Sequence, residues 1–115
     1  MAEIKRLTET LRQFAADRDW DQFHSPKNLA SALAVEAAEL LEPFQWLTEE
    51  QSRNLPASKL AAVKDEIADV FIYLVRLSDK LGVDLIGAAD DKILRNAERY
   101  PVAKAKGSSA KYTDI

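Results

Sequence analysis

Glu36-Ala37-Ala38-Glu39 is the stretch from which we predict both the fold and the chemistry of this chain. Residues three apart on a helix lie on one face about one turn along, so Glu36 and Glu39 point the same way. Three leucines share the same arc of that helix: Leu29, Leu33 and Leu40. Burying a carboxylate on an apolar stripe is costly unless a positive group meets it. The stretch therefore predicts a helix whose core-facing side carries an acidic pair.

The same spacing of acids recurs downstream at Glu66-Ile67-Ala68-Asp69. Apolar residues bracket this second pair: Val63, Ile67, Val70, Phe71 and Leu74. If the two helices pack together, the carboxylates of Glu36, Glu39, Glu66 and Asp69 converge, and neither motif contains a Lys or Arg to neutralise them. Hard oxygen ligands without Cys or His favour Mg²⁺, with Mn²⁺ as an alternative. The sequence predicts a divalent metal site, although each pair alone is also compatible with a solvated helix face.

A di-iron bundle is the competing metal site, and it needs Glu-x-x-His on two helices. The single histidine, His24, lies in a predicted connector, which excludes that site. With a Mg²⁺ site, bound metal polarises a phosphoryl oxygen and orients a triphosphate, and a carboxylate that is not a ligand can take the proton of an attacking water.

The composition indicates one soluble, mostly helical domain. The chain has 115 residues, 47% hydrophobic and 30% charged, with only 3 Gly and 4 Pro. A net charge of -3 gives no general attraction for nucleic acid, so we expect no nucleic acid polymer as partner. The absence of Cys excludes disulfides and thiolate metal sites. We expect no membrane segment and no secretory leader, and a cytoplasmic location.

Four helices follow from apolar periodicity and capping residues. The first runs from Ile4 to about Arg18, and the second from the Ser25-Pro26 start to about Leu41, before Pro43. We expect Thr48 to Pro56 to be a loop, because it has no sustained apolar period. The third helix starts at a Ser58 cap and runs to about Lys80, with an apolar core face of Leu60, Val63, Ile67, Val70, Phe71, Leu74 and Leu77.

The fourth helix starts at an Asp84 cap, after Gly82 has ended the third, and runs to about Arg99 before Pro101, with Ile86, Ala89, Ile93 and Leu94 inward. The prediction is an all-α, four-helix bundle-like protomer, with one domain over residues 1–103 and a polar tail over residues 104–115. Leu and Ala on more than one helix face predict that a second copy completes the core, as a homo-oligomer.

Several other side chains have two interpretations. Trp20, Phe23, Trp46 and Tyr73 are either core aromatics or contacts for a base, and Trp20 and Trp46 lie in connectors that flank the acidic helix. His24 is either a helix-entry residue or a contact to a base edge. Lys92 and Asn96 either hold phosphates or lie on a solvated face.

One set of stretches runs through nearly the whole chain from Phe14 onward. Its members are Trp20-Asp21-Gln22-Phe23-His24-Ser25-Pro26-Lys27-Asn28-Leu29, Glu36-x-x-Glu39-Leu40, Phe44-Gln45-Trp46, Glu66-Ile67-Ala68-Asp69-Val70-Phe71-Ile72-Tyr73-Leu74, Asn96-x-x-Arg99-Tyr100-Pro101 and Lys111-Tyr112-Thr113. Together they resemble the dCTP pyrophosphatase branch of the MazG-like, all-α nucleoside triphosphate pyrophosphohydrolases.

The resemblance implies Mg²⁺-dependent cleavage of dCTP, or of a 5-modified dCTP, between the α and β phosphates, giving dCMP and pyrophosphate. It implies Glu36, Glu39, Glu66 and Asp69 as metal ligands, and a role in removing surplus or modified dCTP. It also implies a base pocket from Trp20 to His24 with Trp46 and Tyr73, phosphate contacts from Lys92 and Asn96, and a homotetramer built as a pair of dimers.

The chain departs from the family pattern at two places. Leu11 stands where family members have a polar His that can reach the pocket, so base selectivity could differ. The loop between Trp46 and Glu66 is short by a few residues. Two alternatives to the dCTP activity remain: a dUTP-directed or broad-specificity pyrophosphohydrolase, and a non-catalytic helical module for dimerisation or nucleotide binding.

Overall fold

The computed structural model describes residues 2–115, and all regular secondary structure in that part of the chain is helical. In chain order the elements are α1 (Ala2–Asp17), η1 (Asp21–Phe23), α2 (Pro26–Leu41), α3 (Glu49–Arg53), α4 (Ala57–Leu81), α5 (Leu85–Arg99), α6 (Val102–Ala105) and η2 (Tyr112–Asp114). The all-α prediction is therefore confirmed. The chain forms two compact units, the first ending at Gly82 and the second covering Val83–Ile115.

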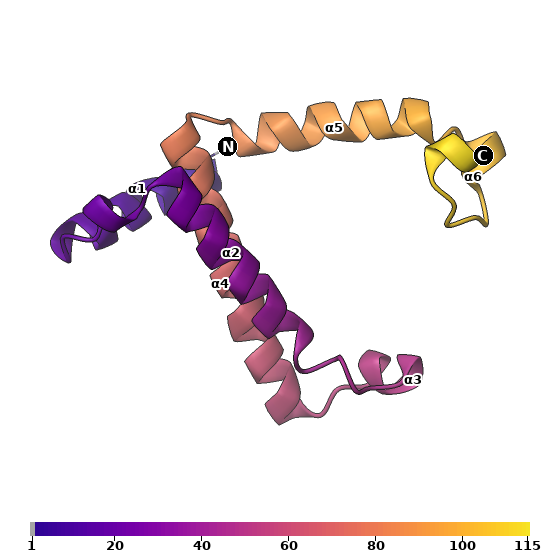
Figure 1. The fold of residues 1–115 in the computed structure, drawn as a ribbon, viewed down its shortest axis with the longest axis horizontal. Helices are drawn as coiled ribbons and strands as arrows, with labels where there is room; N and C mark the ends of the chain where they lie inside the picture. The colour runs from indigo at the N-terminus through magenta and orange to yellow at the C-terminus, as the bar shows by residue number, and fades with distance from the viewer. Residues whose placement is uncertain (1) are drawn as a thin grey trace. The chain divides into compact units, whose positions relative to one another are not determined.

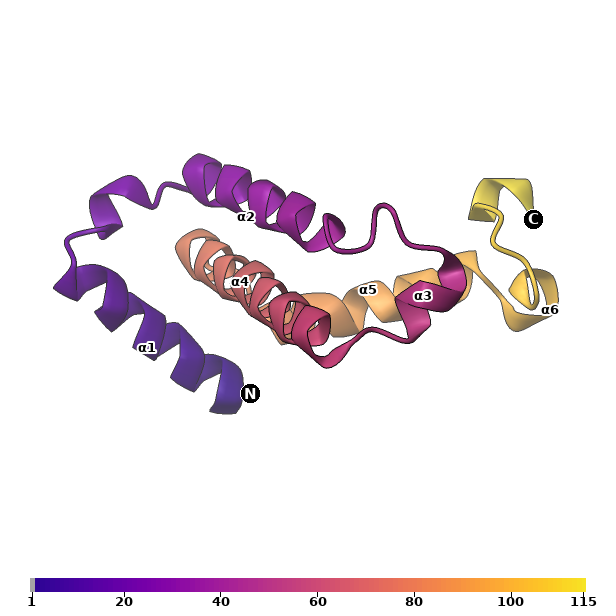
Figure 2. The same cartoon turned by 90° about the horizontal axis from the view of Figure 1, so that it is seen from below.

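In the first unit, α4 packs against both α2 and α1. Figure 1 shows α2 and α4 side by side along their lengths, and Figure 2 shows α4 between α1 and α2. The buried apolar side chains come from all three helices and are Ala15, Leu29, Val63 and Val75. The two acidic motifs thus lie on the pair of helices with the most extensive mutual packing.

The start of α2 has the predicted cap. The Ser25 hydroxyl accepts a hydrogen bond from the backbone N–H of Asn28 at 3.2 Å, and Pro26 occupies the first helical position. The helix ends at Leu41, two residues before Pro43. Both ends of α2 therefore lie where the sequence predicted them.

The prediction of a loop from Thr48 to Pro56 is wrong in part, because α3 lies within it. The Thr48 hydroxyl accepts from the N–H of Gln51 at 3.1 Å, and the Gln51 side chain accepts from the N–H of Thr48 at 3.0 Å. This reciprocal capping box satisfies two free donors without any tertiary packing. A helix of 5 residues is too short to show an apolar period, which is why periodicity missed it.

The predicted cap at Ser58 is also wrong. The residue before the helix is Pro56, no side chain caps it, and α4 begins at Ala57. Ser58 therefore lies inside the first turn of α4. At the other end, Gly82 has a φ of +65°, the left-handed conformation that glycine adopts without steric cost, so its role as the stop is confirmed.

The apolar stripe of α4 is wider than the surface that α1 and α2 cover. Val63 is buried, but Leu60, Ile67 and Phe71, which we expected in the core, are 55%, 53% and 38% exposed. A helix of 25 residues with two neighbours leaves part of its circumference uncovered. Three predicted core positions therefore lie at the surface of the single chain.

In the second unit, the Asp84 side chain caps α5 by accepting from the N–H of Gly87 at 3.2 Å, as predicted. Ile93 and Leu94, which we expected inward, are 64% and 68% exposed. This unit offers α5 no long helix to pack against, because its other helical elements are short.

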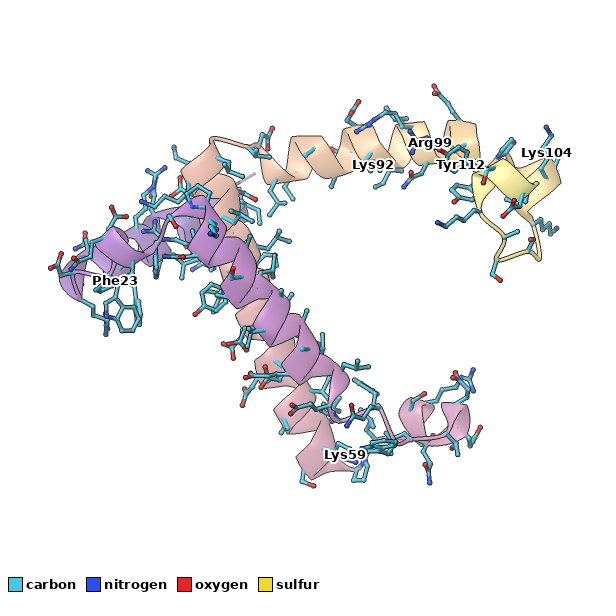
Figure 3. The ribbon with its side chains drawn as sticks, viewed as in Figure 1. Phe23, Lys59, Lys92, Arg99, Lys104 and Tyr112 are labelled. Atoms are coloured by element: carbon cyan, nitrogen blue, oxygen red, sulfur yellow. The ribbon has the colours of Figure 1, made fainter. Side chains whose placement is uncertain are left out.

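The segment that we treated as a polar tail contains part of α6 and the turn η2. The ring of Tyr112 lies 6.0 Å from that of Tyr100, and the guanidinium carbon of Arg99 lies 4.9 Å from the Tyr112 ring centre (Figure 3). The boundary between residues 103 and 104 stays a prediction. Over the described residues, none of the helices combines the length and the apolar character that crossing a membrane requires.

Candidate functional site

Three carboxylates from two helices meet between α2 and α4. Glu36 and Glu39 come from α2 and Glu66 comes from α4, and one oxygen of each lies within 4.8 Å of the others. All three side chains are half-buried. The spacing of three and the side-by-side packing of α2 and α4 are sufficient to bring them together.

The cluster is not electrostatically satisfied by the protein. The Oε2 atoms of Glu36 and Glu66 are buried and accept no hydrogen bond. The ion pairs formed among residues 2–115 involve none of these three acids. The pKa of Glu36 is raised to about 7, mainly because the adjacent Glu39 carboxylate shares its proton, and further by burial and by Glu66.

A divalent cation fits this donor set. Unpaired buried carboxylate oxygens are costly, and the donors are all hard oxygens, the ligands that Mg²⁺ and Mn²⁺ prefer. The identity of the metal and the roles of the individual acids stay predictions.

The fourth predicted acid, Asp69, lies outside the cluster of three but is connected to it. Its charge contributes to the raised pKa of Glu36. Its side chain also lines a neighbouring cavity. Asp69 therefore lies where the acidic cluster and that cavity adjoin.

The cavity has a volume of about 390 Å³ and is lined mainly by apolar and aromatic side chains from α1, the η1 connector and α4. Its lining residues are Leu11, Phe14, Ala15, Trp20, His24, Asp69, Ile72, Tyr73 and Arg76. Three of the predicted base contacts, Trp20, His24 and Tyr73, are among them. So is Leu11, the position at which the sequence departs from the family pattern.

Aromatic packing holds one wall of the cavity in place. The Trp20 ring makes an edge contact with Phe14 at 5.7 Å between centroids and lies 6.4 Å from the His24 ring. The guanidinium of Arg18 lies 3.6 Å from the centre of the Phe14 ring. Trp20 is 44% exposed and lines the cavity, so part of its side chain is accessible to a ligand.

Arg76, which was not among the predicted site residues, is only 5% exposed and lines the same cavity. Its Nη2 donates to Oδ1 of Asp21 at 2.7 Å, and its Nε donates to Nδ1 of His24 at 3.2 Å. Its Nη1 lies 3.5 Å from Oδ2 of Asp79. The sequence did contain a feature that could have identified Arg76, because it lies inside an apolar run of α4. An arginine that is buried with such a run needs acidic partners.

A second, more open groove of about 530 Å³ lies between the end of α2 and the start of α4. Glu39 and Glu66 line it together with Lys59, a cation that was also not among the predicted site residues. Figure 3 shows Lys59 at the N-terminal end of α4. The groove thus offers both the acidic cluster and a positive charge to an anionic ligand.

The other predicted contacts lie elsewhere or in the other unit. Phe23 is 59% exposed, Trp46 is 87% exposed, and neither lines the cavity. Lys92 and Asn96 belong to α5 in the second unit. The proposed roles of these four residues stay predictions.

Residues 31–115 match the model of the MazG-like family. The chain belongs to the MazG-like family. Over 117 aligned residues it is 45% identical to dCTP pyrophosphatase 1 of Mus musculus and 43% identical to that of Homo sapiens, covering 100% of this chain and 67% of each relative. The MazG-like assignment agrees with the resemblance drawn from the sequence motifs.

A solved structure shares this MazG-like fold. The crystal structure of a pyrophosphatase from Archaeoglobus fulgidus superposes with a TM-score of 0.82 at 38% identity, covering 86% of this chain and 93% of that one. At this identity the likeness extends to the sequence as well as the helical arrangement.

Proposed function

We propose that this protein is a metal-dependent pyrophosphohydrolase that cleaves dCTP, or a 5-substituted dCTP, to dCMP and pyrophosphate. The observation that carries the proposal is the convergence of Glu36, Glu39 and Glu66 beside a cavity lined by Asp69. The choice of dCTP as substrate is inferred from the relatives named dCTP pyrophosphatase 1, which are 43–45% identical across the whole chain.

Glu36, Glu39, Glu66 and Asp69 would hold Mg²⁺, or Mn²⁺ in its place. When bound, the metal supplies a Lewis acid for the phosphoryl oxygens of the triphosphate. The unsatisfied oxygens of Glu36 and Glu66 support this assignment, because a carboxylate cluster without cationic partners is otherwise unfavourable.

The protein's own residues would then bind and orient the nucleotide. Trp20 and Tyr73 present aromatic surfaces to the base in the cavity, and His24 offers a polar contact at its wall. Asp69 adjoins both sites, so a base held there places the phosphates toward the carboxylates. An acid of the cluster that is not a ligand accepts the proton of the attacking water.

Measuring pyrophosphate release from a panel of nucleotides tests this proposal. With Mg²⁺ present we expect the highest kcat/KM on dCTP or 5-methyl-dCTP, and lower values on dUTP, dTTP and CTP. A preference for dUTP, or equal rates on all five, would favour the dUTP-directed or broad-specificity alternative. No release from any of them would favour the non-catalytic helical module.

We also propose a homotetramer, a pair of dimers, in the cytoplasm. The exposed apolar residues Leu60, Ile67 and Phe71 on α4 support association with further copies. Light scattering on the purified protein tests the assembly, since a monomer would contradict it. The proposed cytoplasmic location is supported by the composition, because a chain with 0 Cys suits a reducing compartment.

A further inference from the structure

Arg76 makes a contact that determines the chemical form of His24. A guanidinium is always protonated, and its Nε carries a hydrogen that can only donate. Nε of Arg76 lies 3.2 Å from Nδ1 of His24, so Nδ1 must be the acceptor. A histidine with an acceptor at Nδ1 is the neutral ring with its proton on Nε2.

The guanidinium has little freedom to turn away from His24. Nη2 donates to Asp21 and Nη1 faces Asp79, so carboxylates on two sides hold the group. Each of these acids has a second cation, Lys80 for Asp21 and Arg12 for Asp79. With its side chain only 6% exposed, Arg76 is a rigid, paired cation rather than a mobile surface charge.

The surroundings of His24 disfavour its charged form. Burial lowers the pKa of His24, as do the charges of Arg76 and Lys80, while Asp21 opposes them. The nearby groups thus agree with the hydrogen-bond geometry. Both point to a neutral imidazole at the wall of the cavity.

We propose that Arg76 is a positioning residue that holds His24 as the Nε2-protonated neutral ring, which gives the cavity a hydrogen-bond donor for the acceptor edge of a pyrimidine base. The inference rests on the proposed function, because it assumes that the cavity takes the base. Cytosine presents two adjacent acceptors, O2 and N3, whereas N3 of uracil and thymine carries a hydrogen. A fixed donor directed at N3 therefore favours cytosine over the other two pyrimidines.

The form of His24 can be measured without substrate. His24 is the only histidine, so long-range ¹H–¹⁵N spectra of the ¹⁵N-labelled full chain at neutral pH report its two ring nitrogens without overlap. We expect the Nε2-protonated form in the wild type. A ring protonated at Nδ1, or at both nitrogens, would overturn the assignment. This measurement uses the wild-type protein, so it does not depend on whether a variant folds.

Arg76→Lys keeps the positive charge but loses the planar fork that reaches Asp21 and His24 together. We expect a mixture of ring forms in this variant. Arg12→Met is the matched control, because it removes an ion pair from Asp79, and the charges that lower the pKa of His24 do not include Arg12. The control should keep the wild-type ring form.

Kinetics separate positioning from a structural role. Loss of one hydrogen bond at the base is worth about tenfold, so Arg76→Lys should raise the KM for dCTP by about that factor with little change in kcat. In the His24→Leu background, Arg76→Lys should add no further rise, because it acts through His24. A fall in kcat together with a fall in melting temperature would overturn the inference, and so would additive effects of the two substitutions.

The two proposals fail in different ways. A wild-type protein that has the expected ring form but hydrolyses no dCTP contradicts the proposed function and leaves the Arg76–His24 relationship intact. A protein that hydrolyses dCTP with His24 protonated at Nδ1 contradicts the inference alone.

Discussion

Glu36 on α2 and Glu66 on α4 each bury one carboxylate oxygen, Oε2, that has no hydrogen-bond partner. The two residues are 30 positions apart in sequence, yet an oxygen of each lies within 4.8 Å of the other and of Glu39. Protein interiors seldom leave such atoms unpaired, and they do so mainly where a ligand or ion completes the site. The pair is therefore the physical basis for assigning a metal centre.

Removing one acid charge while keeping its shape should abolish catalysis. Glu39→Gln or Asp69→Asn should lower kcat in Mg²⁺ by a factor on the order of a hundred or more, with an unchanged helical circular dichroism spectrum. Asp65→Asn, at an exposed acid one residue before Glu66, is the matched control and should retain activity. Wild-type rates in both ligand variants would contradict the metal assignment.

The metal-free protein should lose stability as pH rises from about 4.5 to about 7. The pKa of Glu36 is raised from 4.5 to about 7, so the folded state binds more protons there than the unfolded state, and the free energy of unfolding falls through this window. His24, whose pKa is lowered, acts in the opposite sense because its unfolded form is the more protonated near pH 6.5.

The Glu36→Gln variant isolates the glutamate's part of that pH dependence. Urea unfolding at a series of pH values in a chelator should give a wild-type curve that falls relative to the variant's as pH rises. Parallel curves for the two proteins would mean that Glu36 does not hold an extra proton in the folded state.

Mg²⁺ and nucleotide together should raise the melting temperature. A ligand that binds only the native state stabilises it by about 2.7 kcal/mol at one hundred times its Kd. We expect a larger rise with Mg²⁺ and a non-hydrolysable dCTP analogue than with either alone, measured by differential scanning fluorimetry. No shift at saturating concentrations of both would support the non-catalytic alternative.

Two serines near helix starts should differ in their effect on stability. Ser25 caps α2, so Ser25→Ala should cost about 1 kcal/mol in chemical unfolding. Ser58 lies inside the first turn of α4 and makes no capping bond, so Ser58→Ala should be nearly neutral. Equal costs for the two substitutions would place the start of α4 at Ser58 after all.

Local rules on neighbouring residues anticipated much of the fold. The Ser25 and Asp84 caps and the Gly82 stop involve residues close in sequence, so a pattern of residue types identifies them. The same holds for acids spaced by three on each helix. Only the assumption that the two helices pack was needed to predict the acidic cluster.

What the sequence did not reveal depends on distant partners or on very short elements. Arg76 meets His24 and Asp21, which are 52 and 55 positions away, so its place in an apolar run of α4 could not show which side chains it contacts. The apolar residues of α4 have the helical period that predicted the helix. The sequence did not show how much of this stripe would be exposed, because that depends on how many helices cover it. The helix α3 rests on a capping box rather than on periodicity.

Binding of Mn²⁺ followed by electron paramagnetic resonance tests the metal centre most directly, because free Mn²⁺ gives a signal that diminishes on binding and no turnover is needed. We expect saturable binding to the wild type that is strongly weakened in Glu39→Gln and Asp69→Asn and retained in Asp65→Asn. Equal binding by all four proteins, or none by the wild type, would contradict it.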